Sequence, residues 1–70
     1  MKTISFNNLT EDQKEVVLDH IFDYEAVYHS FNKDWKDIND LRNEVDKGFD
    51  PDYYMTIYIN TEGRIRTLFK

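Results

Sequence analysis

Histidine, aspartate and glutamate are the side chains of this chain that could bind a metal or move protons, because it contains no cysteine. The two histidines, His20 and His29, are nine residues apart. On one helix that separation turns them to opposite sides, so they cannot easily share a metal ion. Glu25 and His29 are four residues apart and could supply two ligands, but such a pair is more often a surface contact between adjacent turns. The sequence therefore predicts no metal site.

Aspartates cluster around Gly48, at Asp46, Asp50 and Asp52. A twelve-residue calcium loop needs a glycine at its sixth position, and counting from Asp46 places Pro51 there. The chain also has no glycine-rich phosphate loop, no paired metal-binding histidine motif and no nucleophile elbow. We therefore expect no enzyme activity and no cofactor.

The most regular charge pattern is a row of carboxylates at steps of four residues. On a helix each step of four advances by about 40°, so such residues form one stripe. No lysine or arginine follows an acid of this stripe at four residues to relieve the repulsion. Two interpretations remain open, a solvated face of an acidic protein or a row of charges that meets a basic partner surface. The stripe consists of Glu11, Glu15, Asp19 and Asp23.

Two further features accompany the stripe. Asp37, Asp40 and Glu44 predict a second acidic face on a second helix. Phe22 lies at the margin of the stripe on a helical projection. It is either covered by the second helix or exposed among acids, and the latter is typical of an interface hot spot.

The elements that would position these residues can be predicted from periodicity. Lys2 to Phe6 alternates as a short strand with one buried face. Thr10 and Gln13 have the spacing of a capping box, which begins a helix from Glu11 to about Ser30. The apolar face of this helix consists of Val17, Leu18, Ile21, Tyr24, Tyr28 and Phe31.

A second helix is expected after the break at Asn32–Asp34, with Asp34 as its cap and Gly48 as the left-handed residue that ends it. Residues 49–52 are expected to form a turn. The apolar face of the second helix consists of Trp35, Ile38, Leu41, Val45 and Phe49.

The last third predicts a hairpin, with strands at Tyr53–Ile59 and Arg64–Phe69 and a turn in which Gly63 has positive φ. The element order is β-α-α-β-β. We expect one α+β domain over residues 1–70, with two helices packed on one face of a small, three-stranded, mostly antiparallel sheet.

The net charge of −5 is unevenly distributed. Residues 10–52 carry thirteen of the fourteen acidic residues and five basic ones, a net charge of −8, whereas residues 53–70 carry +2. If the helices cover the apolar face of the sheet, its other face is open. Aromatic and cationic side chains there could stack bases and bind phosphates, or simply stabilise an exposed sheet by cross-strand pairing. This alternative site consists of Tyr54, Tyr58, Arg64 and Arg66.

Size and composition favour an interaction module. Seventy residues offer little depth for a substrate pocket, and no segment is long and apolar enough to be a signal peptide or a membrane span. We expect a soluble, cytoplasmic protein that binds and occludes a basic surface of a partner protein, as an inhibitor or regulator. A nucleic-acid mimic that occludes a nucleic-acid-binding surface is one version. Small acidic, aromatic-rich domains of this style resemble the accessory inhibitors that phages make, although no motif is shared.

Two alternatives of other classes stay open. One is a weak nucleic-acid-binding or regulatory module that uses the Tyr/Arg sheet face, which the overall negative field opposes. The other is a structural subunit that self-associates through the sheet face or the hairpin edge.

Overall fold

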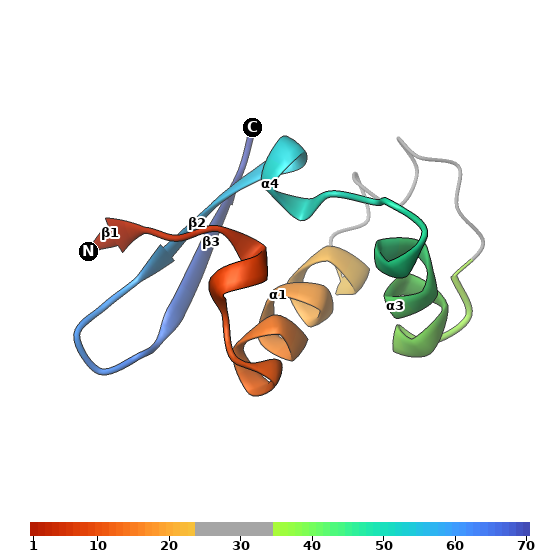
Figure 1. Ribbon diagram of the computed structural model, residues 1–70, viewed down its shortest axis with the longest axis horizontal. Helices are drawn as coiled ribbons and strands as arrows, with labels where there is room; N and C mark the ends of the chain where they lie inside the picture. The colour runs from red at the N-terminus through yellow and green to blue at the C-terminus, as the bar shows by residue number, and fades with distance from the viewer. Residues whose placement is uncertain (24–34) are drawn as a thin grey trace.

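The computed structural model describes residues 1–23 and 35–70 and has an α+β architecture, as predicted (Figure 1). A three-stranded antiparallel sheet carries its helices on one side. In chain order the described elements are β1 (Lys2–Thr3), the 3-10 helix η1 (Phe6–Asn8), α1 (Glu11–Asp23), α3 (Ile38–Asp46), α4 (Pro51–Tyr54), β2 (Met55–Ile59) and β3 (Ile65–Phe69).

The sheet has the order β1-β2-β3, so the first strand pairs with the near strand of the C-terminal hairpin. In the hairpin Ile57 faces Thr67, and Tyr58 faces Arg66. The turn is closed by the Asn60 side chain, and Gly63 has a φ of +83°, which confirms its predicted role. The alternation of β2 turns Met55 and Ile57 into the core.

The first strand is shorter than predicted. Only Lys2 and Thr3 form strand pairs, and the chain turns into η1 after a last bond from Ile4 N to Ile57 O (3.0 Å). The prediction of a strand to Phe6 is therefore wrong. The backbone N–H of Phe6 donates instead to both carboxylate oxygens of Asp52, each at 3.1 Å. This bond holds the Phe6 ring in the core beneath α1.

The start of α1 confirms the capping box. Gln13 N donates to Thr10 Oγ1 at 3.2 Å, and Thr10 N donates to Gln13 Oε1 at 3.0 Å. Both orphan N–H groups are thus satisfied by side chains. The structure describes this helix to Asp23; its predicted continuation to Ser30 and the break at Asn32–Asp34 lie outside the described residues.

The second helix begins at Ile38, later than predicted. Its cap is Asp37, whose carboxylate accepts the N–H groups of Asn39 and Asp40 at 3.0 and 3.1 Å. The cap of α3 is therefore Asp37 and not the predicted Asp34, which lies outside the described residues. Trp35 therefore precedes the helix, although its side chain is buried as expected.

The end of α3 is the predicted glycine stop. Gly48 has a φ of +114°, and its N–H donates to Val45 O at 3.0 Å while Phe49 N donates to Glu44 O at 2.9 Å. This pair of bonds is the Schellman motif, which satisfies carbonyls at a helix end and reverses the chain.

The segment before β2 differs from prediction. Residues 49–52 were expected to form a turn and Tyr53 to begin a strand, but Asp50 caps the one-turn helix α4, with Pro51 in its first turn. Tyr53 and Tyr54 belong to α4. Their rings continue a series of contacts from the core: Trp35 to Phe49 at 5.8 Å, Phe49 to Tyr54 at 5.3 Å and Tyr54 to Tyr53 at 4.8 Å between centroids.

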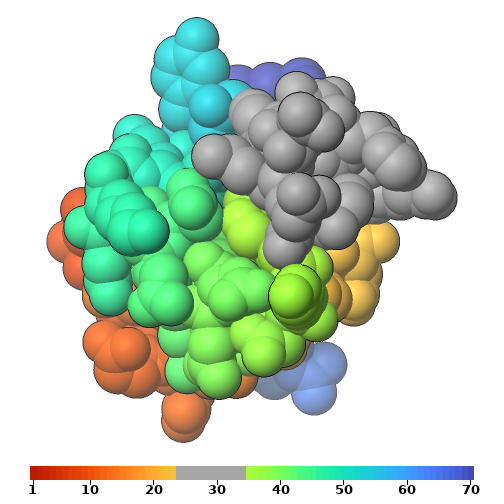
Figure 2. Space-filling model, turned by 90° about the vertical axis from the view of Figure 1, so that its right-hand side faces the viewer, coloured from red at the N-terminus to blue at the C-terminus, as the bar shows by residue number. Residues whose placement is uncertain are grey.

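Figure 1 shows how the helices are layered, with α1 between the sheet and α3. Gln13 and His20 of α1 bond to the hairpin, at Gly63 O (3.1 Å) and Thr67 Oγ1 (3.0 Å). Figure 2 looks at the opposite end of the molecule, where α3 and the turn after it form the surface. One hydrophobic cluster joins all layers and consists of Phe6, Leu9, Val17, Leu18, Ile21, Trp35, Leu41, Met55 and Ile57.

Candidate functional site

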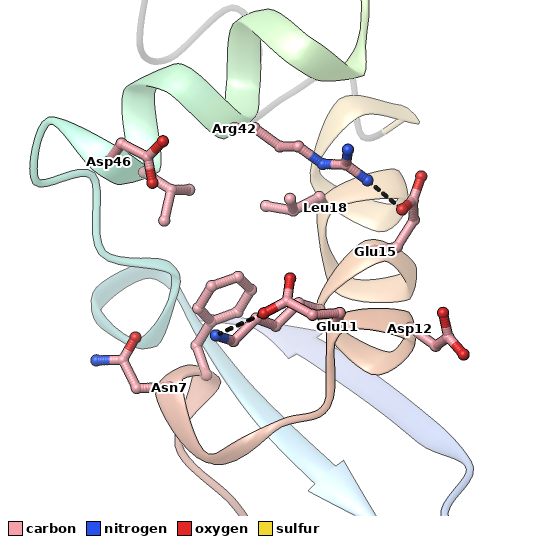
Figure 3. A pocket seen from close by; sticks show the side chains of 10 residues that line it. Asn7, Glu11, Asp12, Glu15, Leu18, Arg42 and Asp46 are labelled. Carbon is pink, nitrogen blue, oxygen red and sulfur yellow. Dashed lines mark hydrogen bonds and ion pairs between the residues drawn. The ribbon is translucent and has the colours of Figure 1, made fainter.

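A groove opens between η1, α1 and α3 (Figure 3). It encloses about 560 Å³. Figure 3 shows Glu11 and Glu15 of α1 on one rim, and Asn7 of η1 and Asp46 of α3 on the other. The groove exists because η1 ends the strand early and brings the chain beneath α1. Its lining consists of Phe6, Asn7, Glu11, Asp12, Lys14, Glu15, Leu18, Arg42, Val45 and Asp46.

The floor of the groove is apolar. Phe6 and Leu18 are buried there, and Val45 is half-buried against the core. Lys14 lies over the Phe6 ring, with its Nζ atom 5.7 Å from the ring centroid. The Lys14 ammonium therefore lies over the face of the aromatic ring in a cation–π arrangement.

Both cations of the groove are held by carboxylates. Lys14 Nζ lies 3.6 Å from Glu11 Oε1, and the guanidinium of Arg42 reaches from α3 to the Glu15 carboxylate on α1 (Figure 3). The Arg42–Glu15 pair is half exposed, with 44% and 47% of the two side chains accessible. Among the described residues, Asp12 and Asp46 form no ion pair, so the lining keeps a net negative charge.

Beside the groove, α1 carries an exposed acidic ridge. Asp12, Val16, Asp19 and Asp23 are separated by four, three and four residues, which places them within about 60° of one direction. All four are exposed, and Val16 is 39% accessible. None of the three carboxylates forms an ion pair within the described part of the chain. We call Asp12, Asp19 and Asp23 around Val16 the acidic ridge.

The structure divides the predicted carboxylate stripe in two. Glu11 and Glu15 turn toward the groove and pair with cations, whereas Asp19 and Asp23 belong to the acidic ridge. Counting at steps of four missed Asp12, because it joins the ridge at a step of seven from Asp19. The Glu11–Lys14 spacing of three residues was the sequence signal for partial neutralisation.

Phe22 is half-buried and packs against the hydrophobic cluster. This partial burial disagrees with the interpretation in which Phe22 is exposed among acids. Among the described residues of α1, the exposed apolar side chain beside the acids is Val16 and not Phe22.

The second predicted acidic face lies apart from the groove. Asp37 caps α3, and Asp40 Oδ2 accepts the backbone N–H of Lys36 at 2.8 Å. Glu44 is half-buried on the same flank. The flank of α3 that lines the groove carries Arg42 and Asp46, which sequence reasoning did not select. Arg42 finds its carboxylate 27 residues away, so no local pattern indicated the pair.

The alternative site on the open sheet face is only partly assembled. Tyr58 faces Arg66 across β2 and β3 and Thr3 across β1 and β2. Arg64 is exposed just before β3, but Tyr54 lies in α4 and stacks on Phe49, so its predicted place on this face is wrong. Leu68, which is 62% exposed opposite Thr56, was missed as a member of the face.

Two other classes of site were sought in the described residues. No group of three or more histidine, aspartate or glutamate side chains in residues 1–23 and 35–70 is arranged to hold a metal ion. Within the same residues, every helix is too short or too polar to cross a membrane.

Comparison with known proteins finds no match: no family model, no curated protein and no solved structure is significantly similar to the chain.

Proposed function

We propose that this protein is an acidic interaction module that binds a basic surface of a partner protein and blocks it, as an inhibitor or regulator. The observation that supports this proposal is the acidic ridge. Its three carboxylates are exposed, lie on one face of α1 and form no ion pair among the described residues. Unpaired carboxylates at this spacing repel one another, and a cationic partner relieves that repulsion.

The groove extends the surface that the partner would contact. It adjoins α1, and its lining adds the carboxylates of Glu11, Glu15 and Asp46 to those of the ridge. Oriented charges of one sign steer an oppositely charged partner and raise its association rate, an effect that salt weakens. A nucleic-acid-binding surface of the partner is the natural complement, because it is built to accept rows of negative charge.

The open sheet face supports direct nucleic-acid binding less well. With Tyr54 in α4, the aromatic ring that the described strands present on the open face is Tyr58, which lies beside Arg66, whereas Phe69 of β3 packs against the core. One ring and a few cations make a weak stacking platform in a chain of net charge −5. Cross-strand stabilisation accounts for this pair.

The test is affinity capture from a nuclease-treated lysate at low salt, with the wild-type protein and two variants as bait. The ridge variant carries Asp19→Lys and Asp23→Lys, which raises the net charge from −5 to −1. The control carries Thr3→Lys, Thr61→Lys and Glu62→Lys, three exposed positions in β1 and the hairpin turn that give the same net charge. We expect the wild-type protein and the control to retain a basic partner that salt releases, and the ridge variant to lose it.

The captured partner is then assayed for nucleic-acid binding with increasing amounts of the wild-type protein. Loss of binding is expected if its basic surface is blocked. A ridge variant that folds and captures the same partner as the wild-type protein would show that the acidic ridge is only a solvated face.

A further inference from the structure

The groove already holds one guanidinium group, that of Arg42. Its guanidinium crosses from α3 to the Glu15 carboxylate on α1, above the buried side chain of Leu18 (Figure 3). Both side chains of this pair are close to half exposed. A guanidinium–carboxylate pair at such a position contributes little to stability, so another cation can exchange with it at little cost.

We propose that the groove receives an arginine side chain of the basic partner, which replaces Arg42 on Glu15. This inference rests on the proposed function, since it names the group through which a basic partner would be recognised. Arg42 is then a placeholder that occupies the site until the partner arrives.

The groove suits an arginine in size and lining. Its volume of about 560 Å³ lies within the range of roughly 300–1,000 Å³ that is usual for ligand pockets. The apolar floor of Phe6, Leu18 and Val45 would contact the methylene stem. The planar fork of a guanidinium binds a carboxylate in two places at once, which an ammonium cannot do.

The charge of the rims favours the same occupant. Of the four acidic side chains in the lining, Glu11 and Glu15 are paired, and Asp12 and Asp46 are not, within the described residues. An incoming guanidinium that displaces Arg42 leaves the Arg42 side chain free to move toward Asp46, one turn along α3. After the exchange Glu15 is paired with the partner's arginine and Arg42 with Asp46, so no cation is left unpaired.

The experiment titrates the protein with a hexa-arginine peptide at low salt and follows methyl resonances by NMR. Leu18 and Val45 report on the groove, and Val16 reports on the acidic ridge. We expect the groove methyls to shift together with Val16. A hexa-lysine peptide of equal charge should shift Val16 but perturb Leu18 and Val45 less, because its ammonium groups do not match the Glu15 site.

The decisive variant is Arg42→Ala, with Lys47→Ala as its control. Each removes one positive charge from the C-terminal half of α3 or its cap, and both side chains are exposed. If Arg42 is the placeholder, its removal tightens hexa-arginine binding by about threefold, as expected for an exposed pair, and Lys47→Ala changes it clearly less. In a Glu15→Gln background the advantage of Arg42→Ala should disappear. Thermal unfolding of each variant checks that it is folded.

The outcomes separate this inference from the proposed function. Groove shifts together with a specific effect of Arg42→Ala support it. Shifts of Val16 alone, with equal effects of Arg42→Ala and Lys47→Ala, overturn the arginine site and leave the ridge as the binding face. No shift with either peptide at low salt overturns both.

Discussion

Several carboxylates of this acidic chain accept hydrogen bonds from its own backbone N–H groups. Asp37 and Asp50 cap helices, and Asp52 holds the N–H of Phe6 from 46 residues away. A carboxylate used in this way is fixed in place and is less available to a partner. Counting acids in the sequence therefore overstates the binding surface, and it is the acids without such bonds, such as Asp19 and Asp23, that we assign to it.

Asp52 provides the first stability test. Replacing it with alanine removes the acceptor of a partly buried N–H, and a hydrogen bond to a charged group contributes about 1.5–3 kcal/mol. We expect Asp52→Ala to lower the free energy of unfolding in urea by roughly that amount, and Asp52→Asn, which keeps one acceptor oxygen, to lower it less. Asp19→Ala, at an exposed position without a side-chain bond, should leave stability nearly unchanged. Equal effects of Asp52→Ala and Asp19→Ala would contradict the role of the bond.

At the scale of elements, three local signals in the sequence were predictive. The Thr10–Gln13 capping box, the glycine stop at Gly48 and the hairpin turn at Gly63 all appear as expected. Each depends on residues within a few positions of one another. Sequence periodicity was enough to predict the α+β class for the same reason.

Two elements were mispredicted for different reasons, because β1 ends at a distant contact whereas α4 begins at a local cap that periodicity does not reveal. The strand ends early because Phe6 bonds to Asp52, and α4 forms where Asp50 caps a turn of two tyrosines that β-propensity alone would place in a strand. The candidate groove also depends on a distant contact, since the Arg42–Glu15 pair joins residues that no helical period relates. The acidic layer could be predicted from sequence, but the groove within it could not.

The role of Gly48 in ending α3, one of the helices that line the groove, can be tested by substitution. Its φ of +114° is strained for any residue with a Cβ atom, although no atom lies within 4 Å of the place that a Cβ would occupy. We expect Gly48→Ala to destabilise the fold by about 1–3 kcal/mol through backbone strain alone. Urea unfolding measures the loss, with Asn43→Ala at an exposed position of α3 as the control. No loss on Gly48→Ala would mean that the helix ends in another conformation.

For the whole molecule, the consequence of its charge is self-repulsion. The helical segment carries −8 of charge in residues 10–52, against +2 in residues 53–70. At 0.1 M ionic strength the Debye length is about 10 Å, so repulsion between exposed charges that lie farther apart than this is largely screened. The folded state should therefore gain stability when salt is added, as long as attraction between layers is the smaller effect.

This expectation can be measured with urea midpoints at about 10 and 150 mM NaCl. We expect the wild-type midpoint to rise, and that of the Asp19→Lys, Asp23→Lys variant to rise less, because its net charge is only −1. A wild-type midpoint that falls with salt would show that ion pairs between the layers, such as Arg42–Glu15, outweigh the repulsion.

The series of ring contacts that ends at Tyr53 has an optical consequence. Trp35 is the chain's single tryptophan and is buried, whereas Tyr53, at the far end of the series, is 72% exposed. Phe49 and Tyr54 connect the two. Opening of α4 would move Tyr53 and Tyr54 together away from Phe49, the ring that contacts Trp35. The emission of Trp35 is thus an intrinsic, label-free reporter of that corner of the molecule, independent of the acidic ridge.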